Sequence, residues 1–95
     1  MTALLTFEIF RGTAPESEAD RLRSEIESAL KIRNWQQEKV HTTFTKTWAS
    51  VSDAQLKAEI FEVVSAARKV AAVSQPMRIE YVVLGGLGPA VASSF

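Results

Sequence analysis

The sequence predicts an α+β fold in two layers, an antiparallel sheet with two helices packed on one of its faces. Two patterns lead to this prediction. Apolar residues alternate with polar ones near both ends of the chain, which is typical of half-buried strands. Between these ends, two segments with apolar residues at helical spacing flank a stretch rich in β-branched residues. The resulting order, β-α-β-β-α-β, is that of the ferredoxin-like sandwich.

The first strand is predicted from the alternation of Leu5, Phe7 and Ile9 with polar residues, and we expect this set to face the core. Leu4 and Phe10 have the opposite parity, so the second face of the strand is also partly apolar. A strand that is apolar on both faces is typical of a central position, or of a face that a partner covers.

The first helix is predicted at about 15–31. Thr13 and Glu16 have the spacing of a capping box, and Pro15 suits a first helical turn. The apolar residues of this segment form one stripe at helical spacing: Ala19, Leu22, Ile26, Ala29 and Leu30. The stripe predicts the side of the helix that packs on the sheet.

Residues 34–48 are predicted to be extended, because β-branched residues dominate them. One interpretation makes 35–37 a separate short strand, with a turn at Glu38 and Lys39. The other interpretation is a single long strand over 34–48, which would reduce the sheet to three strands. Phe44 and Trp48 share a parity with Val40, which favours a place in the core over a place on a stacking surface.

The second helix has the clearest start signal in the chain. Ser52 and Gln55 have the spacing of a capping box. The helix is expected to stop at 74–76, because Pro76 disfavours a helical conformation at the residue before it. Its apolar stripe contains seven residues: Leu56, Ile60, Val63, Val64, Ala67, Val70 and Ala71. We expect Glu59 and Glu62, one helical turn apart, to be solvated.

The last strand and the tail complete the prediction. Ile79, Tyr81 and Val83 alternate with less apolar residues, as in a half-buried strand. Residues 1–86 are predicted to form a single α+β domain, and 87–95 a flexible C-terminal tail. Deletion of 86–95 is expected to weaken partner binding and to leave the thermal midpoint nearly unchanged.

Helices on one side leave the other face of the predicted sheet uncovered. The residues expected there are Leu4, Thr6, Phe10, Thr43, Thr45, Thr47, Val82 and Leu84. Monomers seldom expose large apolar patches, so this face predicts self-association as a homodimer. The residues expected to carry it are Leu4, Phe10, Val82 and Leu84.

Composition narrows the possible functions. The chain has 95 residues, a formal net charge of +0 and no cysteine. It therefore has no net positive charge to attract polyanions, and no thiolate to act as a nucleophile or a metal ligand. The absence of cysteine fits a reducing compartment, and we expect a cytoplasmic protein. No apolar run is long enough to cross a membrane, so no membrane association is expected.

Candidate chemistry is sparse. His41 is the single histidine, and no second histidine or nearby carboxylate completes a triad or a metal site. We therefore expect no catalytic residue, no metal and no cofactor. Aromatic rings stack on bases and basic groups contact phosphates, which defines a candidate nucleic-acid or partner-binding set: Arg33, Trp35, Lys39, His41, Thr43, Thr45 and Lys46.

The layout of these segments resembles a known group of proteins. Trp35, the extended segment 40–48, the capped helix from Ser52 and the strand over 77–84 look like small CRISPR-associated endoribonucleases and related toxin–antitoxin proteins. The resemblance covers most of the chain and implies a ferredoxin-like fold, a dimer and a role in phage defence or toxin control. Metal-dependent members carry an aspartate at the end of the first strand, whereas this chain has none over 6–11. No catalytic residue is therefore carried over.

Two functional hypotheses result. The first is a small non-catalytic interaction module that forms a homodimer through the open sheet face or an edge strand and binds a macromolecular partner, most simply a protein. The alternative is an RNA-binding or DNA-binding protein, or an endoribonuclease-like protein of the same fold.

Overall fold

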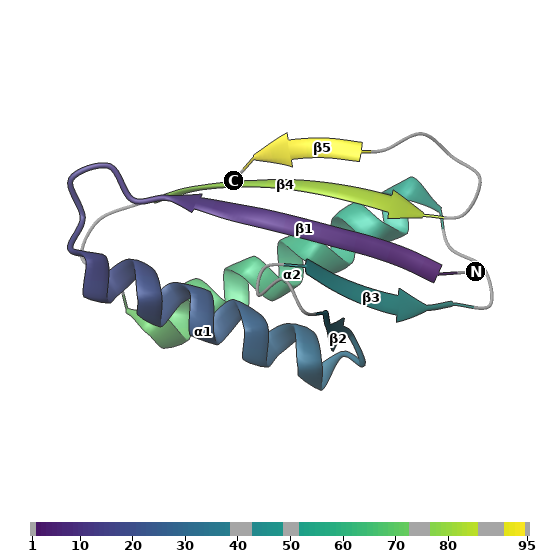
Figure 1. The fold of residues 1–95 in the computed structure, drawn as a ribbon, viewed down its shortest axis with the longest axis horizontal. Coiled ribbons are helices and arrows are strands. Elements are labelled where there is room, and N and C mark those ends of the chain that lie inside the picture. The colour runs from purple at the N-terminus through teal and green to yellow at the C-terminus, as the bar shows by residue number, and fades with distance from the viewer. Residues whose placement is uncertain (1, 39–42, 49–51, 73–76, 86–90, 95) are drawn as a thin grey trace.

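A computed structural model of the chain describes residues 2–38, 43–48, 52–72, 77–85 and 91–94. The predicted α+β fold, with two helices and an antiparallel sheet, is confirmed (Figure 1). In chain order the elements are β1 (Thr2–Phe10), α1 (Glu16–Ile32), β2 (Gln36–Gln37), β3 (Thr43–Thr47), α2 (Asp53–Ala71), β4 (Arg78–Gly85) and β5 (Val91–Ser94). In this described part of the chain, neither helix is both long and apolar enough to cross a membrane.

The sheet has five strands in the order β2-β3-β1-β4-β5, and each neighbouring pair is antiparallel. β1 is the central strand and pairs with β3 on one side and with β4 on the other. Both helices lie on the same side of the sheet (Figure 1). The arrangement of the first six elements is consistent with the predicted ferredoxin-like sandwich.

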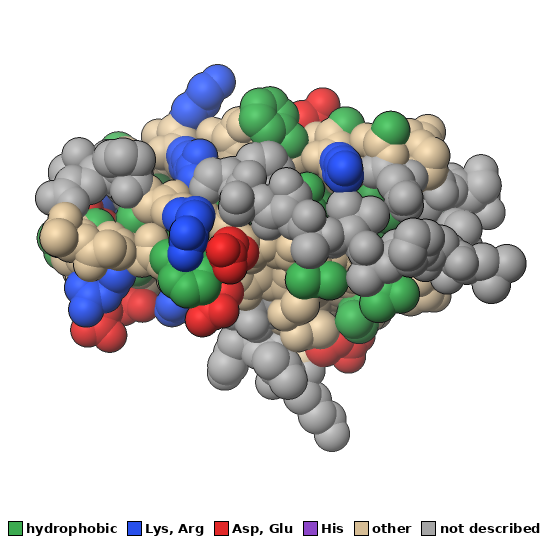
Figure 2. All heavy atoms as spheres, turned by 90° about the horizontal axis from the view of Figure 1, so that it is seen from above, with side chains coloured by type: hydrophobic (Ala, Val, Ile, Leu, Met, Phe, Trp, Pro, Cys, Tyr) green, Lys and Arg blue, Asp and Glu red, His purple; other side chains and the backbone are tan. Residues whose placement is uncertain are grey.

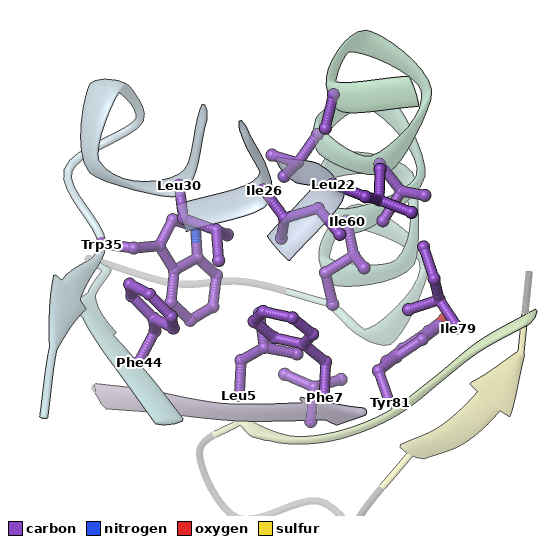
Figure 3. Close-up of a cluster of buried hydrophobic side chains, with 14 of the residues drawn as sticks. Leu5, Phe7, Leu22, Ile26, Leu30, Trp35, Phe44, Ile60, Ile79 and Tyr81 are labelled. Carbon is purple, nitrogen blue, oxygen red and sulfur yellow. The ribbon is translucent and has the colours of Figure 1, made fainter. Parts of the chain in front are cut away.

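The core lies between the sheet and the helices. The alternation predicted for β1 is confirmed, because Leu5 and Phe7 are buried while Leu4 is exposed. Side chains from β1, β3 and β4 point toward the apolar stripes of the two helices (Figure 3). The cluster includes Leu5, Phe7, Leu22, Ile26, Leu30, Phe44, Ile60, Ile79 and Tyr81. Removal of this apolar surface from water is the main stabilising contribution to the fold.

The two helices begin in different ways. At α2 the predicted capping box is confirmed: Ser52 Oγ accepts a hydrogen bond from the Gln55 backbone N–H at 3.2 Å, and Gln55 Oε1 accepts one from the Ser52 N–H at 2.8 Å. At α1 the prediction of Thr13 as the N-cap of a box with Glu16 is wrong, because the N-cap is Pro15, which makes no side-chain cap hydrogen bond. Residues 11–14 instead close a turn, in which the Ala14 N–H donates to the Arg11 carbonyl at 2.9 Å.

Of the two interpretations of residues 34–48, the separate short strand is confirmed. Gln36 and Gln37 form β2 and pair with Thr45 and Phe44 of β3. The backbone N–H of Glu38 donates to the Thr43 carbonyl at 2.8 Å, so the chain has reversed by this point. Lys39, in the predicted turn, lies outside the described residues.

The prediction of a flexible tail over 87–95 differs from the structure at Val91–Ser94, which form β5. This strand pairs with β4 from Val83↔Val91 to Glu80↔Ser94 (Figure 1). The physical reason is that the outer edge of β4 would otherwise present unpaired backbone N–H and C=O groups. Four residues are too few for their periodicity to indicate a strand.

Candidate interaction surface

The face of the sheet opposite the helices carries a compact apolar group, formed by Leu4, Val82 and Leu84. Leu4 lies directly opposite Leu84 in the β1–β4 ladder, and Val82 lies opposite Thr6 in the next pair on the same face. The three side chains of the apolar group are 41%, 38% and 43% exposed, respectively. Each of the three keeps more than a third of its surface exposed, and the β1–β4 ladder places them side by side, so they form one apolar patch.

Threonines extend this face across β3. Thr45 pairs with Leu4, Thr43 with Thr6, and Thr47 with Thr2. Paired residues of an antiparallel ladder point to the same side of the sheet, so these threonines border the apolar group. The Thr45 hydroxyl donates to Glu38 Oε1 at 2.8 Å, whereas Thr2 and Thr47 are exposed at the end of the face.

The other end of the same face is charged. Glu8 of β1 lies directly opposite Glu80 of β4, and Phe10 lies opposite Arg78. Arg78 Nε is 3.6 Å from Glu80 Oε1, and the Arg78 guanidinium stands 4.6 Å from the centroid of the Phe10 ring. Seen from above the view of Figure 1, hydrophobic side chains lie in several places, and at the left of the molecule they adjoin basic and acidic ones (Figure 2).

The structure places all four residues predicted for self-association on this face. Leu4, Val82 and Leu84 adjoin one another, but Phe10 does not join them. The pair of Glu8 and Glu80 separates Phe10 from the apolar group, and Arg78 covers part of its ring. The predicted set is therefore one patch of three residues and a fourth residue at the charged end.

A second cluster lies on the helix side of the sheet and is centred on Glu59 of α2. Lys46 Nζ is 3.0 Å from Glu59 Oε1, and the Trp35 indole N–H donates to Glu59 Oε2 at 3.1 Å. Arg33 Nη1 is 3.7 Å from Glu59 Oε1, and Arg33 Nη2 is 3.0 Å from Glu62 Oε2. The side chains of Lys46 and Glu59 are only 14% and 13% exposed, so water screens their attraction weakly.

The end of α1 positions Trp35 for this contact. Asn34 adopts a left-handed conformation with φ of 70°, which asparagine tolerates better than most residues. The backbone N–H of Trp35 then donates to the Leu30 carbonyl at 3.0 Å. This reversal directs the indole into the core, where the Trp35 side chain is buried among its neighbours (Figure 3).

Trp48 completes the cluster beside β3. Its ring lies edge-on to that of Trp35, with centroids 6.5 Å apart and an interplanar angle of 75°. Lys46 Nζ stands 4.0 Å from the centroid of the Trp48 ring, within range of a cation–π interaction. The indole nitrogen of Trp48 is buried and has no hydrogen-bond partner within the described structure.

The predicted nucleic-acid or partner-binding set is divided between these two places. Arg33 and Lys46 pair with carboxylates, while Thr43 and Thr45 lie on the opposite, uncovered face. Trp35 is 2% exposed, so the prediction that it lies at a binding surface is wrong. The set also included Lys39 and His41, which lie outside the described residues.

Glu59 is the residue that sequence reasoning missed, because it was expected to be solvated. One signal could have found it: a buried tryptophan usually finds an acceptor for its indole N–H. Lys46 shares the parity of Phe44 and therefore faces the helices, which placed a cation near the same acceptor. Glu62 is 60% exposed, as expected, although it pairs with Arg33.

Comparison with known proteins adds no assignment: no family model, curated protein or solved structure matches this chain. Within the described residues, no three histidine, aspartate or glutamate side chains gather as metal ligands would. Residue chemistry and geometry are therefore the basis for a functional proposal.

Proposed function

We propose that this chain is a small non-catalytic interaction module that self-associates through the uncovered face of β3, β1 and β4. One observation carries the proposal. Leu4, Val82 and Leu84, each 38–43% exposed, adjoin one another on a sheet face that no described element covers. A second copy of the chain would remove this apolar surface from water.

The size of the face suits such an interface. Strands lie about 4.8 Å apart and rise about 3.3 Å per residue, so a three-stranded face the length of β1 has a footprint of roughly 400 Å². Because side chains project from the sheet, the accessible surface area of the face is larger than this flat footprint. A standard protein interface buries about 800 Å² per partner. The flat footprint is about half of that value, which suits a small interface and a dimer of modest affinity.

The charges on this face favour a protein partner over a nucleic acid. Glu8 and Glu80 would repel phosphate groups, and Arg78 beside them is paired with Glu80. Arg33 and Lys46, on which the nucleic-acid alternative partly depends, pair with carboxylates away from this face. These contacts support self-association as the better proposal.

The test is the oligomeric state of the wild type and of Val82→Asp, measured by light scattering after size exclusion over a range of concentrations. We expect a dimer for the wild type and a monomer for Val82→Asp, because a buried unpaired carboxylate is strongly unfavourable. Val70→Asp is the matched control, since Val70 is 66% exposed on α2, and it should remain dimeric. Circular dichroism establishes that each variant is folded.

Two results would contradict the proposal: a monomeric wild type at high concentration, or a Val82→Asp variant that stays dimeric. The nucleic-acid alternative has its own measurement, a labelled-RNA binding assay at low and moderate salt. Binding that falls steeply as salt rises would support that alternative. Cleavage of the RNA would argue for an endoribonuclease-like activity.

A further inference from the structure

The uncovered face is not uniform along its strands, and this asymmetry restricts how a second copy can dock. Successive cross-strand pairs on β1 and β4 are Leu4 with Leu84, Thr6 with Val82, Glu8 with Glu80, and Phe10 with Arg78. The apolar group of Leu4, Val82 and Leu84 thus occupies one half of the face, and the two opposed carboxylates lie in the other half with Phe10 and Arg78. In a two-fold symmetric dimer, both the apolar half and the charged half of each copy must face some part of the other copy.

We infer that two copies dock face to face with β1 of one copy antiparallel to β1 of the other. The inference rests on the proposed self-association through this face. It concerns the orientation of the partner copy and the residues that meet across the interface.

Two-fold symmetry between stacked sheets offers two simple orientations. If the axis runs along the strands, every row faces the same row of the partner. The four carboxylates of two Glu8–Glu80 pairs would then meet across a gap of about 10 Å, the spacing of stacked sheets. Burial lowers the local dielectric and strengthens this repulsion, so that orientation is disfavoured.

If the axis instead lies across the strands, the order of the cross-strand rows in one copy is reversed relative to the other. An axis between the Leu4 row and the Thr6 row sets Leu4 against Thr6 of the partner, and Leu84 against Val82 of the partner. The two apolar groups then cover each other. The carboxylates of the two copies end up at opposite ends of the interface, about 20 Å apart along the strands.

The antiparallel orientation also gives the carboxylates suitable neighbours. Glu8 and Thr2 lie at equal distances from the axis, on opposite sides of it. Glu8 of one copy therefore faces Thr2 of the other copy across the interface. Thr2 is exposed, and its hydroxyl can donate a hydrogen bond to a carboxylate. Phe10 and Arg78 would extend past the end of the partner's β1 and stay in water.

Cross-linking of introduced cysteines tests the orientation, because the chain has no cysteine of its own. Thr6→Cys lies beside the proposed axis, whereas Thr2→Cys lies far from it, and both substitutions leave the carboxylates intact. A short bis-maleimide is added at a concentration at which the wild type is dimeric. Linked dimer is then measured on a denaturing gel.

We expect Thr6→Cys to give linked dimer and Thr2→Cys to give almost none, since the two Thr2 positions would be about 20 Å apart. Efficient linking of both variants would overturn the inference, because it indicates an axis along the strands. A dimer in which neither variant links would also overturn it, by placing the contact elsewhere. A wild type that is monomeric refutes the proposed function itself, so the two failures are distinguishable.

Discussion

The indole Nε1 of Trp35 donates a hydrogen bond of 3.1 Å to Oε2 of Glu59, a residue 24 positions further along the chain. This bond ties the segment after α1 to the middle of α2. Lys46 of β3 binds the same carboxylate, so Glu59 joins three parts of the fold. A largely buried carboxylate with several donors is strongly held in place, and its loss leaves those donors without an acceptor.

Glu59→Ala should therefore destabilise the fold by about 1–3 kcal/mol, because the Trp35 N–H and the Lys46 ammonium lose their acceptor in a poorly hydrated place. Urea unfolding measures the change. The matched control is Glu62→Ala: that carboxylate is 60% exposed, and its loss should change stability by less than about 0.5 kcal/mol. Equal effects of the two substitutions would show that the Glu59 cluster has no special role.

Removal of residues 87–95 should destabilise the domain by about 1–2 kcal/mol, since β4 loses the backbone hydrogen bonds that it makes with β5. For a domain of this size, each kcal/mol corresponds to a shift of about 4–8 °C in the thermal midpoint. Calorimetry measures the shift, and hydrogen exchange should show faster exchange in β4. An unchanged midpoint would restore the prediction, made from sequence, of a tail that contributes nothing to stability.

Glu8→Gln should stabilise the protein by about 0.2–1 kcal/mol, because like charges directly opposite each other in a sheet are destabilising. The gain should shrink in concentrated salt, which screens the repulsion between exposed charges. Urea unfolding of both proteins at two salt concentrations tests this. A gain that is independent of salt would point to a cause other than the charge of Glu80.

Leu84→Ser should weaken the proposed dimer about fivefold, the equivalent of about 1 kcal/mol, because only the 43% of Leu84 that is exposed remains to be buried by a partner. Phe10→Ser is the comparison, and it should leave the dimer dissociation constant nearly unchanged because Phe10 lies at the charged end. Sedimentation equilibrium measures both constants. A larger effect of Phe10→Ser would place the contact at the charged end of the face and contradict the proposal.

Much of the fold follows from local patterns in the sequence. The parity of Leu5 and Phe7 predicts which side of β1 meets the helices, because the side-chain period of a strand is fixed at two. The capping box of Ser52 predicts where α2 begins. The same parity rule predicts the uncovered face, on which Leu4 and Leu84 lie.

The features that sequence reasoning missed depend on long-range contacts. The partial burial of Glu59 results from the approach of Trp35 and Lys46, which come from other elements. Thr13 has the spacing of a capping residue, but a turn closed by Ala14 takes it away from the N-cap. β5 forms because β4 offers an unpaired edge, which four residues of sequence cannot reveal.

The position of β1 has a consequence for how the chain folds during synthesis. This central strand pairs along nearly its whole length with β4, from Ala3↔Gly85 to Phe10↔Arg78. The ribosome makes both helices and two other strands before it makes β4. One side of β1 therefore stays unpaired until most of the chain has been translated, and folding through such distant pairings is slow. During that interval, the nascent chain presents an unpaired strand edge, whose backbone N–H and C=O groups other chains can join by strand pairing.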